Sequence, residues 1–287
     1  RAVSIILLVL LAISAVAQRG GESVYNFLEL TKSARVAALG GKNVSIDDGD
    51  LNLVFHNPAL LRASMDQQMN LNYVNYFAGV NFGYTSYAFK KEGVGTFAGG
   101  IHYVDYGSYD RTDEYGNMHG TFRSSEYAIN LLYGRTFFDS VLSVGVNVKP
   151  IFSIYEQYTS LGLTADLGVV YTIRATNTTA GFVLKNMGLQ ITSFSGTRER
   201  VPFEIQAGIT QGLAHAPFRF SIQLQHLERW DLTYEKKQDE QLIFGPEPAT
   251  DVRFDEFADK LMRHAIFGVE ALLGEHFHVD LGYNYKR

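Results

Sequence analysis

Two groups of polar residues have spacings that could bind a metal ion. His276 and His278 are two positions apart, so they would share one face of a strand, where a third ligand from a neighbouring strand could complete a site. Residues 47–50 carry three aspartates around a glycine, as calcium-binding loops do, but the bidentate glutamate of an EF-hand is missing. Strand alternation and an acidic turn explain both groups, so we expect no metal and no other cofactor.

Motifs for catalysis are absent from the sequence. It has no Gly-x-Ser-x-Gly elbow, no Walker loop and no dinucleotide fingerprint. Cysteine is absent as well, which excludes disulfides and thiolate chemistry. A net charge of -5 argues against a nucleic-acid partner. We therefore predict no catalytic residues and no enzymatic activity; an outer-membrane lipase or protease is the enzymatic alternative.

The first 17 residues have the pattern of a signal peptide. Arg1 precedes an apolar run over residues 5–11, and the small residues Ala15, Val16 and Ala17 precede Gln18. The mature chain is expected to begin near Gln18. The missing initiator methionine indicates that the start of the leader is not included, and the apolar run is shorter than the ~20 residues of a membrane anchor.

From residue 69 onward the sequence alternates with a period of two. The clearest case is residues 161–174, where the apolar side chains of one face are interleaved with polar or small side chains such as Asp166 and Arg174. If the apolar face contacts lipid, both charged residues must point inward, because a charge facing mid-bilayer lipid costs ~2 to 4 kcal/mol.

Eleven strands follow from this alternation. They are predicted at residues 69–77, 80–89, 94–104, 124–137, 142–148, 161–174, 178–187, 203–209, 218–224, 265–273 and 277–285. Twenty Phe and seventeen Tyr suit the aromatic belts of a membrane barrel, and a mean hydropathy of -0.06 is too low for a helical membrane protein. The predicted fold class is all-β, a transmembrane antiparallel β-barrel at residues 69–287. A soluble β-sandwich is the architectural alternative.

The connections between these strands alternate in length. Long connections are expected at residues 105–123, 155–160, 188–201 and 231–262, and short turns at 139–140, 174–177, 212–216 and 274–275. In outer-membrane barrels the long connections lie outside the cell. The tight first turn at residues 78–79 is an exception.

The longest connection contains a predicted amphipathic helix. A charged stretch at residues 235–240 and two prolines precede it, and Asp255, Phe257, Ala258, Leu261 and Met262 follow at helical spacing. This helix could pack over the barrel mouth or bind a partner. Because eleven strands cannot close a single-chain bacterial barrel, we also expect the chain to be incomplete at its C-terminus.

Residues 18–68 do not alternate. Small residues at 33–41 are followed by the acidic residues 47–50 and by a turn at Asn57 and Pro58. Small residues allow close packing, so we predict that residues 18–68 form a plug inside the barrel.

The same segment carries a family resemblance. Its motif comprises Ala34, Arg35, Gly40 and Gly41, then an acidic patch, and then Asn57, Pro58, Ala59 and Leu60. This order resembles the outer-membrane family that includes FadL-type fatty acid transporters and PorV-like barrels. Residues 22–30 and 54–61 are most similar to the PorQ family of the type IX secretion system of Bacteroidota, and the resemblance is specific over roughly the first sixty mature residues.

The resemblance implies a non-enzymatic barrel of about fourteen strands in the Gram-negative outer membrane, in contact with its lipid. Such a barrel would hold a PorZ-like surface protein beside PorU-like and PorV-like components, with the external loops as the docking surface. The alternative is a FadL-type transporter of fatty acids or other hydrophobic molecules, which needs an apolar pocket near the plug. The polar inward faces of the predicted strands favour the first function over the second, and a general porin has no use for a plug.

Overall fold

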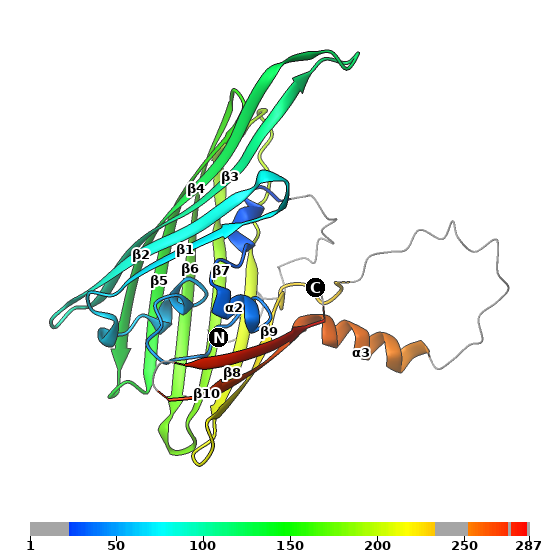
Figure 1. Cartoon of the computed structure of the whole chain (residues 1–287). Coiled ribbons are helices and arrows are strands. Elements are labelled where there is room, and N and C mark those ends of the chain that lie inside the picture. The colour runs from blue at the N-terminus through cyan, green and yellow to red at the C-terminus, as the bar shows by residue number, and fades with distance from the viewer. Residues whose placement is uncertain (1–22, 233–251, 275–276, 286–287) are drawn as a thin grey trace, which may run out of the picture.

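The computed structural model describes residues 23–232, 252–274 and 277–285. The described strands form one antiparallel sheet in which the strand order follows the chain from β1 to β11 (Figure 1). Each strand pairs with its neighbours in sequence, and β1 and β11 stand at the two ends of this order. The predicted all-β class is therefore confirmed. The predicted signal peptide, residues 235–240 and His276 lie outside the described residues.

All eleven predicted strands have a counterpart in the sheet. Their bounds are β1 Met69–Asn75, β2 Asn81–Lys91, β3 Gly95–Thr112, β4 Met118–Phe137, β5 Leu142–Tyr155, β6 Tyr158–Ile173, β7 Thr178–Thr192, β8 Glu204–Gly212, β9 Phe218–Leu224, β10 Ala265–Leu272 and β11 His278–Asn284. Short 3-10 helices, η5 Phe77–Gly79 and η6 Arg174–Thr176, form two of the turns.

Two of the predicted long connections are wrong. Most of residues 105–123 continue the β3–β4 hairpin, where Tyr109 stacks on Phe122 with ring centroids 5.5 Å apart. Cross-strand contacts of this kind stabilise a strand whose own sequence is polar and glycine-rich. Within residues 155–160 only residues 156–157 form a turn, because Tyr155 already pairs with Tyr158 and residues 158–160 belong to β6. The long and short connections therefore do not alternate strictly.

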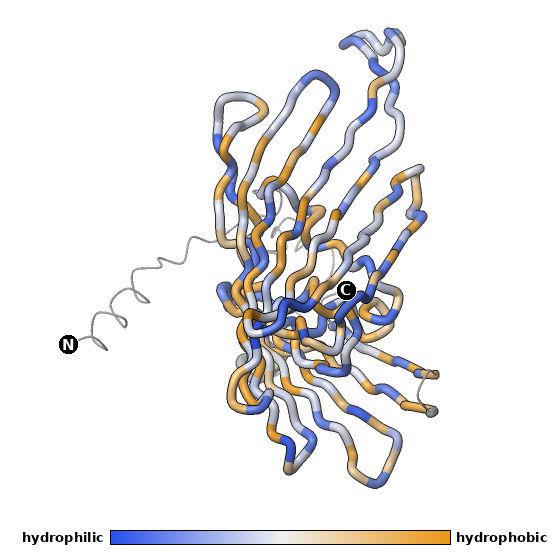
Figure 2. The backbone as a smooth tube through the Cα atoms, turned by 90° about the vertical axis from the view of Figure 1, so that its left-hand side faces the viewer, coloured by the Kyte–Doolittle hydropathy of each residue, from blue (hydrophilic) through white to orange (hydrophobic). Residues whose placement is uncertain are grey.

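The two faces of the sheet differ in polarity. On β6, Leu163 and Leu167 are 44% and 47% exposed, whereas Thr164 and Asp166 are 1% and 0% exposed. Figure 2 shows the same alternation of apolar and polar residues along the strands. The inward position predicted for Asp166 is confirmed. The inward position predicted for Arg174 is wrong, because the strand ends in η6, and there the exposed guanidinium donates to the Asp139 carbonyl.

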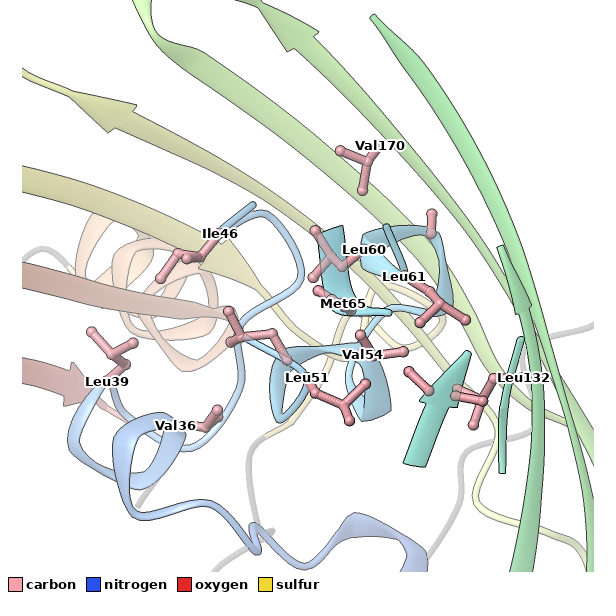
Figure 3. Packing of buried hydrophobic residues seen from close by; sticks show 14 residues of the cluster. Val36, Leu39, Ile46, Leu51, Val54, Leu60, Leu61, Met65, Leu132 and Val170 are labelled. Atoms are coloured by element: carbon pink, nitrogen blue, oxygen red, sulfur yellow. The ribbon is translucent and has the colours of Figure 1, made fainter. Parts of the chain in front are cut away.

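Residues 23–68, here called the N-terminal segment, pack against the polar face of the sheet. They contain η1 Asn26–Glu29, α2 Ala34–Ala38, η2 Leu53–Phe55, η3 Pro58–Leu60 and η4 Ala63–Met65. Ten of the fourteen residues in the main hydrophobic cluster come from this segment, and the strands contribute only Ala88, Ala98, Leu132 and Val170. Figure 3 shows these side chains meeting between the segment and the strands.

The helix predicted in the last connection is α3, Val252–His264. It projects away from the strands (Figure 1) and is bound to the end of β11, where the Tyr285 hydroxyl donates to Asp259 Oδ1 at 2.7 Å. In the described part of the chain, no helix combines the length and the hydrophobicity needed to cross a membrane.

Candidate functional site

The second half of the sequence motif lies where the N-terminal segment touches the sheet. Asn57 caps η3 by accepting from the Ala59 amide at 3.0 Å, and its Nδ2 donates to the Val44 carbonyl at 2.8 Å. Pro58 occupies the first turn of η3, where its missing N–H costs nothing. Asn57, Ala59 and Leu60 are all buried. The motif therefore fixes the backbone of the segment and carries no reactive group.

Inward-facing glycines of the strands make this contact possible. A Cβ atom added at Gly145 of β5 would overlap the backbone of Pro58, and one added at Gly168 of β6 would overlap the Asn57 side chain. Only glycine lets two backbones approach so closely. The sheet and the motif are thus complementary in shape.

The first half of the motif contacts the other end of the sheet. Gly40 and Gly41 end α2 with φ values of 92° and 99°, a left-handed conformation that favours glycine. The Gly41 amide donates to the Val36 carbonyl at 2.8 Å, and Asn284 Nδ2 of β11 donates to the Gly40 carbonyl at 3.0 Å. The motif glycines therefore attach the N-terminal segment to the last described strand.

Arg35 is the centre of a partly buried ionic cluster. Its guanidinium lies 2.5 Å from Asp48, 2.9 Å from Asp50 and 2.8 Å from Glu270 of β10. Arg219 of β9 bridges the same groups, at 2.8 Å from Asp48 and 2.5 Å from Glu270. This cluster joins the segment to two strands that lie far from it in sequence.

The cluster shifts the pKa of Asp48. Burial by itself would raise the pKa of this carboxyl, but hydrogen bonds and charge attraction from Arg35, followed by Arg219, outweigh burial and lower it to about 2. The same partners raise the pKa of Arg35 against the effect of its burial. Asp48 is therefore ionised in the folded protein at every physiological pH.

A pH-dependent stability follows from this shift. The unfolded carboxyl has the ordinary pKa of 3.8, so it binds a proton before the folded carboxyl does. The ionised Asp48 therefore contributes fully to the free energy of unfolding at pH values above 3.8. This contribution is lost as the pH falls toward 2, and we expect the free energy of unfolding to fall by about 2 kcal/mol. Urea unfolding in detergent at a series of pH values measures it. Asp48→Asn should flatten this part of the pH profile, and parallel profiles for the two proteins would contradict the assignment.

The predicted acidic turn is held by guanidinium groups. Asp47 is paired with Arg62, which also donates to Ser143 of β5, and both Asp48 and Asp50 bind Arg35. All three aspartates of the turn therefore act as ion-pair partners within the protein.

Two clusters in the described residues place ligand-type atoms within 4.8 Å of one another. One combines His278 with Glu270 and Asp280, and the other combines Glu29, Glu204 and His226. In each, a cation of the chain already binds one carboxylate: Arg35 and Arg219 bind Glu270, and Lys42 binds Glu204 at 2.5 Å. One carboxylate of each cluster is therefore already neutralised within the protein.

Sequence reasoning missed a buried cationic region beside Phe55. The Lys32 ammonium lies 3.1 Å from the centroid of the Phe55 ring, and Lys185 also lies over this ring. Lys149 is paired with Asp166 at 2.6 Å. Burial, followed by the charges of Lys185 and Lys149, lowers the pKa of Lys32 well below its ordinary value. Alternation places Lys149 and Lys185 on the inward face, but only the fold brings Lys32 to them.

The described chain also contains a cavity of about 440 Å³ between the start of the N-terminal segment, the strands β3 to β6 and the β7–β8 connection. Four tyrosines and a phenylalanine line it, together with two glutamates: Tyr25, Tyr106, Tyr155, Tyr158, Phe194, Glu126 and Glu199. None of these residues was singled out from the sequence as a site. A clue was present in the tyrosines clustered at residues 103–115.

Comparisons of the chain with models of known protein families and with curated protein sequences give no match.

Proposed function

We propose that this chain is a non-enzymatic outer-membrane β-barrel, that its N-terminal segment is the plug, and that it anchors a large surface protein in a type IX secretion and attachment complex. The membrane part of this proposal rests on the polarity of the sheet, whose outward face is apolar and whose face toward the N-terminal segment is polar. The resemblance of the N-terminal motif to the PorQ family carries the choice of complex, with a PorZ-like protein as the expected partner and PorU-like and PorV-like components beside it.

A sheet with an apolar outward face and a polar inward face is suited to a lipid environment. Outward residues along the strands are apolar, and the inward residues include buried lysine, aspartate, asparagine and glutamine side chains such as Lys149 and Asp166. A soluble β-sheet protein buries its apolar face and exposes its polar one. Contact of the apolar face with hydrocarbon stabilises the opposite arrangement.

The outward face of β4 has the order expected across a bilayer. Tyr127, Ile129, Leu131 and Tyr133 follow one another on this face, and Arg135 comes after them. Tyr127 contacts Tyr103 of β3 and Tyr133 contacts Phe97, with ring centroids 5.1 and 5.0 Å apart. The two aromatic pairs are six residues, or about 20 Å, apart along the strand, which at the ~35 to 45° tilt of barrel strands is about 15 Å of height, so both pairs fit within the ~25 Å apolar band and its aromatic borders.

The N-terminal segment has the properties of a fixed plug. Its backbone rests on Gly145 and Gly168, and Arg35 and Arg62 connect it to strands on both sides. A segment held by close backbone contacts and buried ion pairs does not open easily. This supports an anchoring barrel over an open pore.

A FadL-type transporter is the alternative. It would need an apolar pocket near the plug. The cavity of about 440 Å³ does touch the segment through Val24 and Tyr25, but two carboxylates and four phenol groups line it. This lining favours a polar or charged ligand over a fatty acid.

Co-purification tests the proposal. The full-length protein, tagged and extracted from its native outer membrane in mild detergent, should bring down one large exported surface protein at near-equal stoichiometry. Replacing residues 231–262 by a short linker should reduce recovery of this partner at least about tenfold, which is about 1.4 kcal/mol of binding free energy.

The matched control is an equal-length Gly-Ser replacement of residues 92–94, which form the β2–β3 turn at the opposite end of the sheet. It should leave recovery unchanged. Purification of the barrel alone with a bound fatty acid would refute the anchoring function and support transport.

A further inference from the structure

The cavity at the loop end of the sheet has an aromatic wall. Tyr106, Tyr155 and Phe194 form a continuous row of rings: the centroids of Tyr106 and Tyr155 are 5.8 Å apart, and Phe194 meets Tyr155 edge to face at 5.3 Å. Tyr25 closes the inner side and is held by a 2.5 Å hydrogen bond to Ser160. Aromatic faces of this kind carry negative electrostatic potential and attract cations.

The cavity also contains a buried carboxylate that has no cationic partner. The described chain has four buried carboxylates, and three of them are in ion pairs: Asp166 with Lys149, Glu204 with Lys42, and Glu270 with two arginines. The fourth, Glu126, accepts hydrogen bonds only from hydroxyls, from Tyr106 at 2.5 Å and from Ser153 at 2.8 Å. Glu126 thus has hydroxyl partners only among the described residues, and a cation that enters the cavity can form an ion pair with it.

The charge of the whole cavity has one sign. Glu199 adds a second carboxylate, and no lysine, arginine or histidine lies among the lining residues. Burial raises the pKa of the Tyr25 phenol, and the charges of Glu126 and Glu199 add to this effect. An anionic or apolar ligand would be disfavoured by the same groups that attract a cation.

We propose that this cavity binds a basic side chain, an arginine or lysine, from the partner polypeptide. The proposal rests on the proposed function, because it takes the loop end of the sheet as the surface that meets a partner. The cavity volume of about 440 Å³ lies within the ~300 to 1,000 Å³ range of ligand pockets and leaves room for a single long side chain. Arginine fits best, because its planar guanidinium stacks on aromatic rings and binds a carboxylate with two parallel hydrogen bonds.

Small probes test this with the purified full-length protein in detergent. N-acetyl-arginine amide should bind in a calorimetric titration, and its neutral isostere N-acetyl-citrulline amide should bind about tenfold more weakly or not at all. Glu126→Gln keeps the size of the side chain and an acceptor for the two hydroxyls, so it should weaken the arginine probe about tenfold by loss of charge. Phe194→Leu should weaken it about threefold through loss of the aromatic face.

Glu114→Gln is the matched control, because Glu114 is an exposed carboxylate in the turn of the neighbouring β3–β4 hairpin. It should leave the affinity unchanged. Equal affinity for the two probes, or unchanged arginine binding in both Glu126→Gln and Phe194→Leu, would overturn the proposal. If Glu126→Gln does not fold, the Phe194→Leu variant and the comparison of the two probes still decide the question.

The two proposals fail in different ways. Charge-selective probe binding without a co-purified surface protein would contradict the anchoring function and leave the cation site in place. A co-purified partner that is retained by Glu126→Gln, together with no probe binding, would contradict the cation site alone.

Discussion

Gly145→Ala should displace the N-terminal segment from the sheet. The added Cβ atom would overlap the carbonyl group of Pro58, and a backbone atom held in η3 between β5 and β6 cannot move aside as a flexible side chain can. Overpacking of a rigid site costs about 1 to 3 kcal/mol and occasionally more, and the contact with backbone puts this substitution at the upper end. The segment should then become accessible, because Asn57 and its neighbours can no longer rest on the sheet.

Limited proteolysis and urea unfolding in detergent measure both effects. Gly145→Ala should increase the rate of cleavage within residues 23–68 and lower the free energy of unfolding by about 3 kcal/mol. Gly99→Ala provides the control, since Gly99 lies in β3 of the same sheet and an added Cβ atom there would have no neighbour within 4 Å. Equal stability of the two variants would show that the segment does not rest on β5.

Arg35→Met should have the second large effect. The substitution keeps an unbranched side chain but removes the cation shared by Asp48, Asp50 and Glu270. Glu270 is 1% exposed, so its charge cannot be rehydrated without breaking the contact between the segment and β10. Removal of one partner from a buried ion pair costs about 3 to 5 kcal/mol, and Arg219 alone cannot balance three carboxylates.

The free energy of unfolding in urea gives the size of this effect. Arg111→Met is the matched control, because Arg111 is also paired with a glutamate, Glu156, but is 51% exposed. An exposed pair of this kind contributes about 1 kcal/mol at most. Combining Arg35→Met with Glu270→Gln should cost less than the sum of the two single changes, since the first substitution already leaves Glu270 without one of its partners. A loss no larger than that of Arg111→Met would refute the role of Arg35 as the connection between segment and sheet.

The strands could be predicted from the sequence because alternation is local. The position of Asp166 depends only on its neighbours at two-residue spacing, and the same rule located all eleven strands. The rule was wrong at residues 105–123, because polar residues there are held in the hairpin by cross-strand partners. It was wrong at Arg174 as well, because the strand ends in a turn at that residue. Both errors concern where a strand stops, which depends on its pairing partner.

The motif residues of the N-terminal segment were identified from the sequence, but their contacts were not. Arg35 and Glu270 are 235 positions apart, and only the tertiary fold brings β10 beside α2. In the sequence, Gly145 and Gly168 are ordinary small residues on the inward face of their strands. Only the folded structure shows that they contact Pro58 and Asn57.

The sequence by itself determined the class of the fold, the faces of the strands and the location of the non-alternating segment, because each of these is encoded by residues within a few positions of one another. The tertiary structure alone decided which charges are neutralised and which are not. The ion pairs of Arg35 and Glu270, and the cavity in which Glu126 has no cation, are formed by residues from distant strands and connections. A charge buried by folding takes its partner from whatever the fold places beside it, and no local pattern in the chain records that choice.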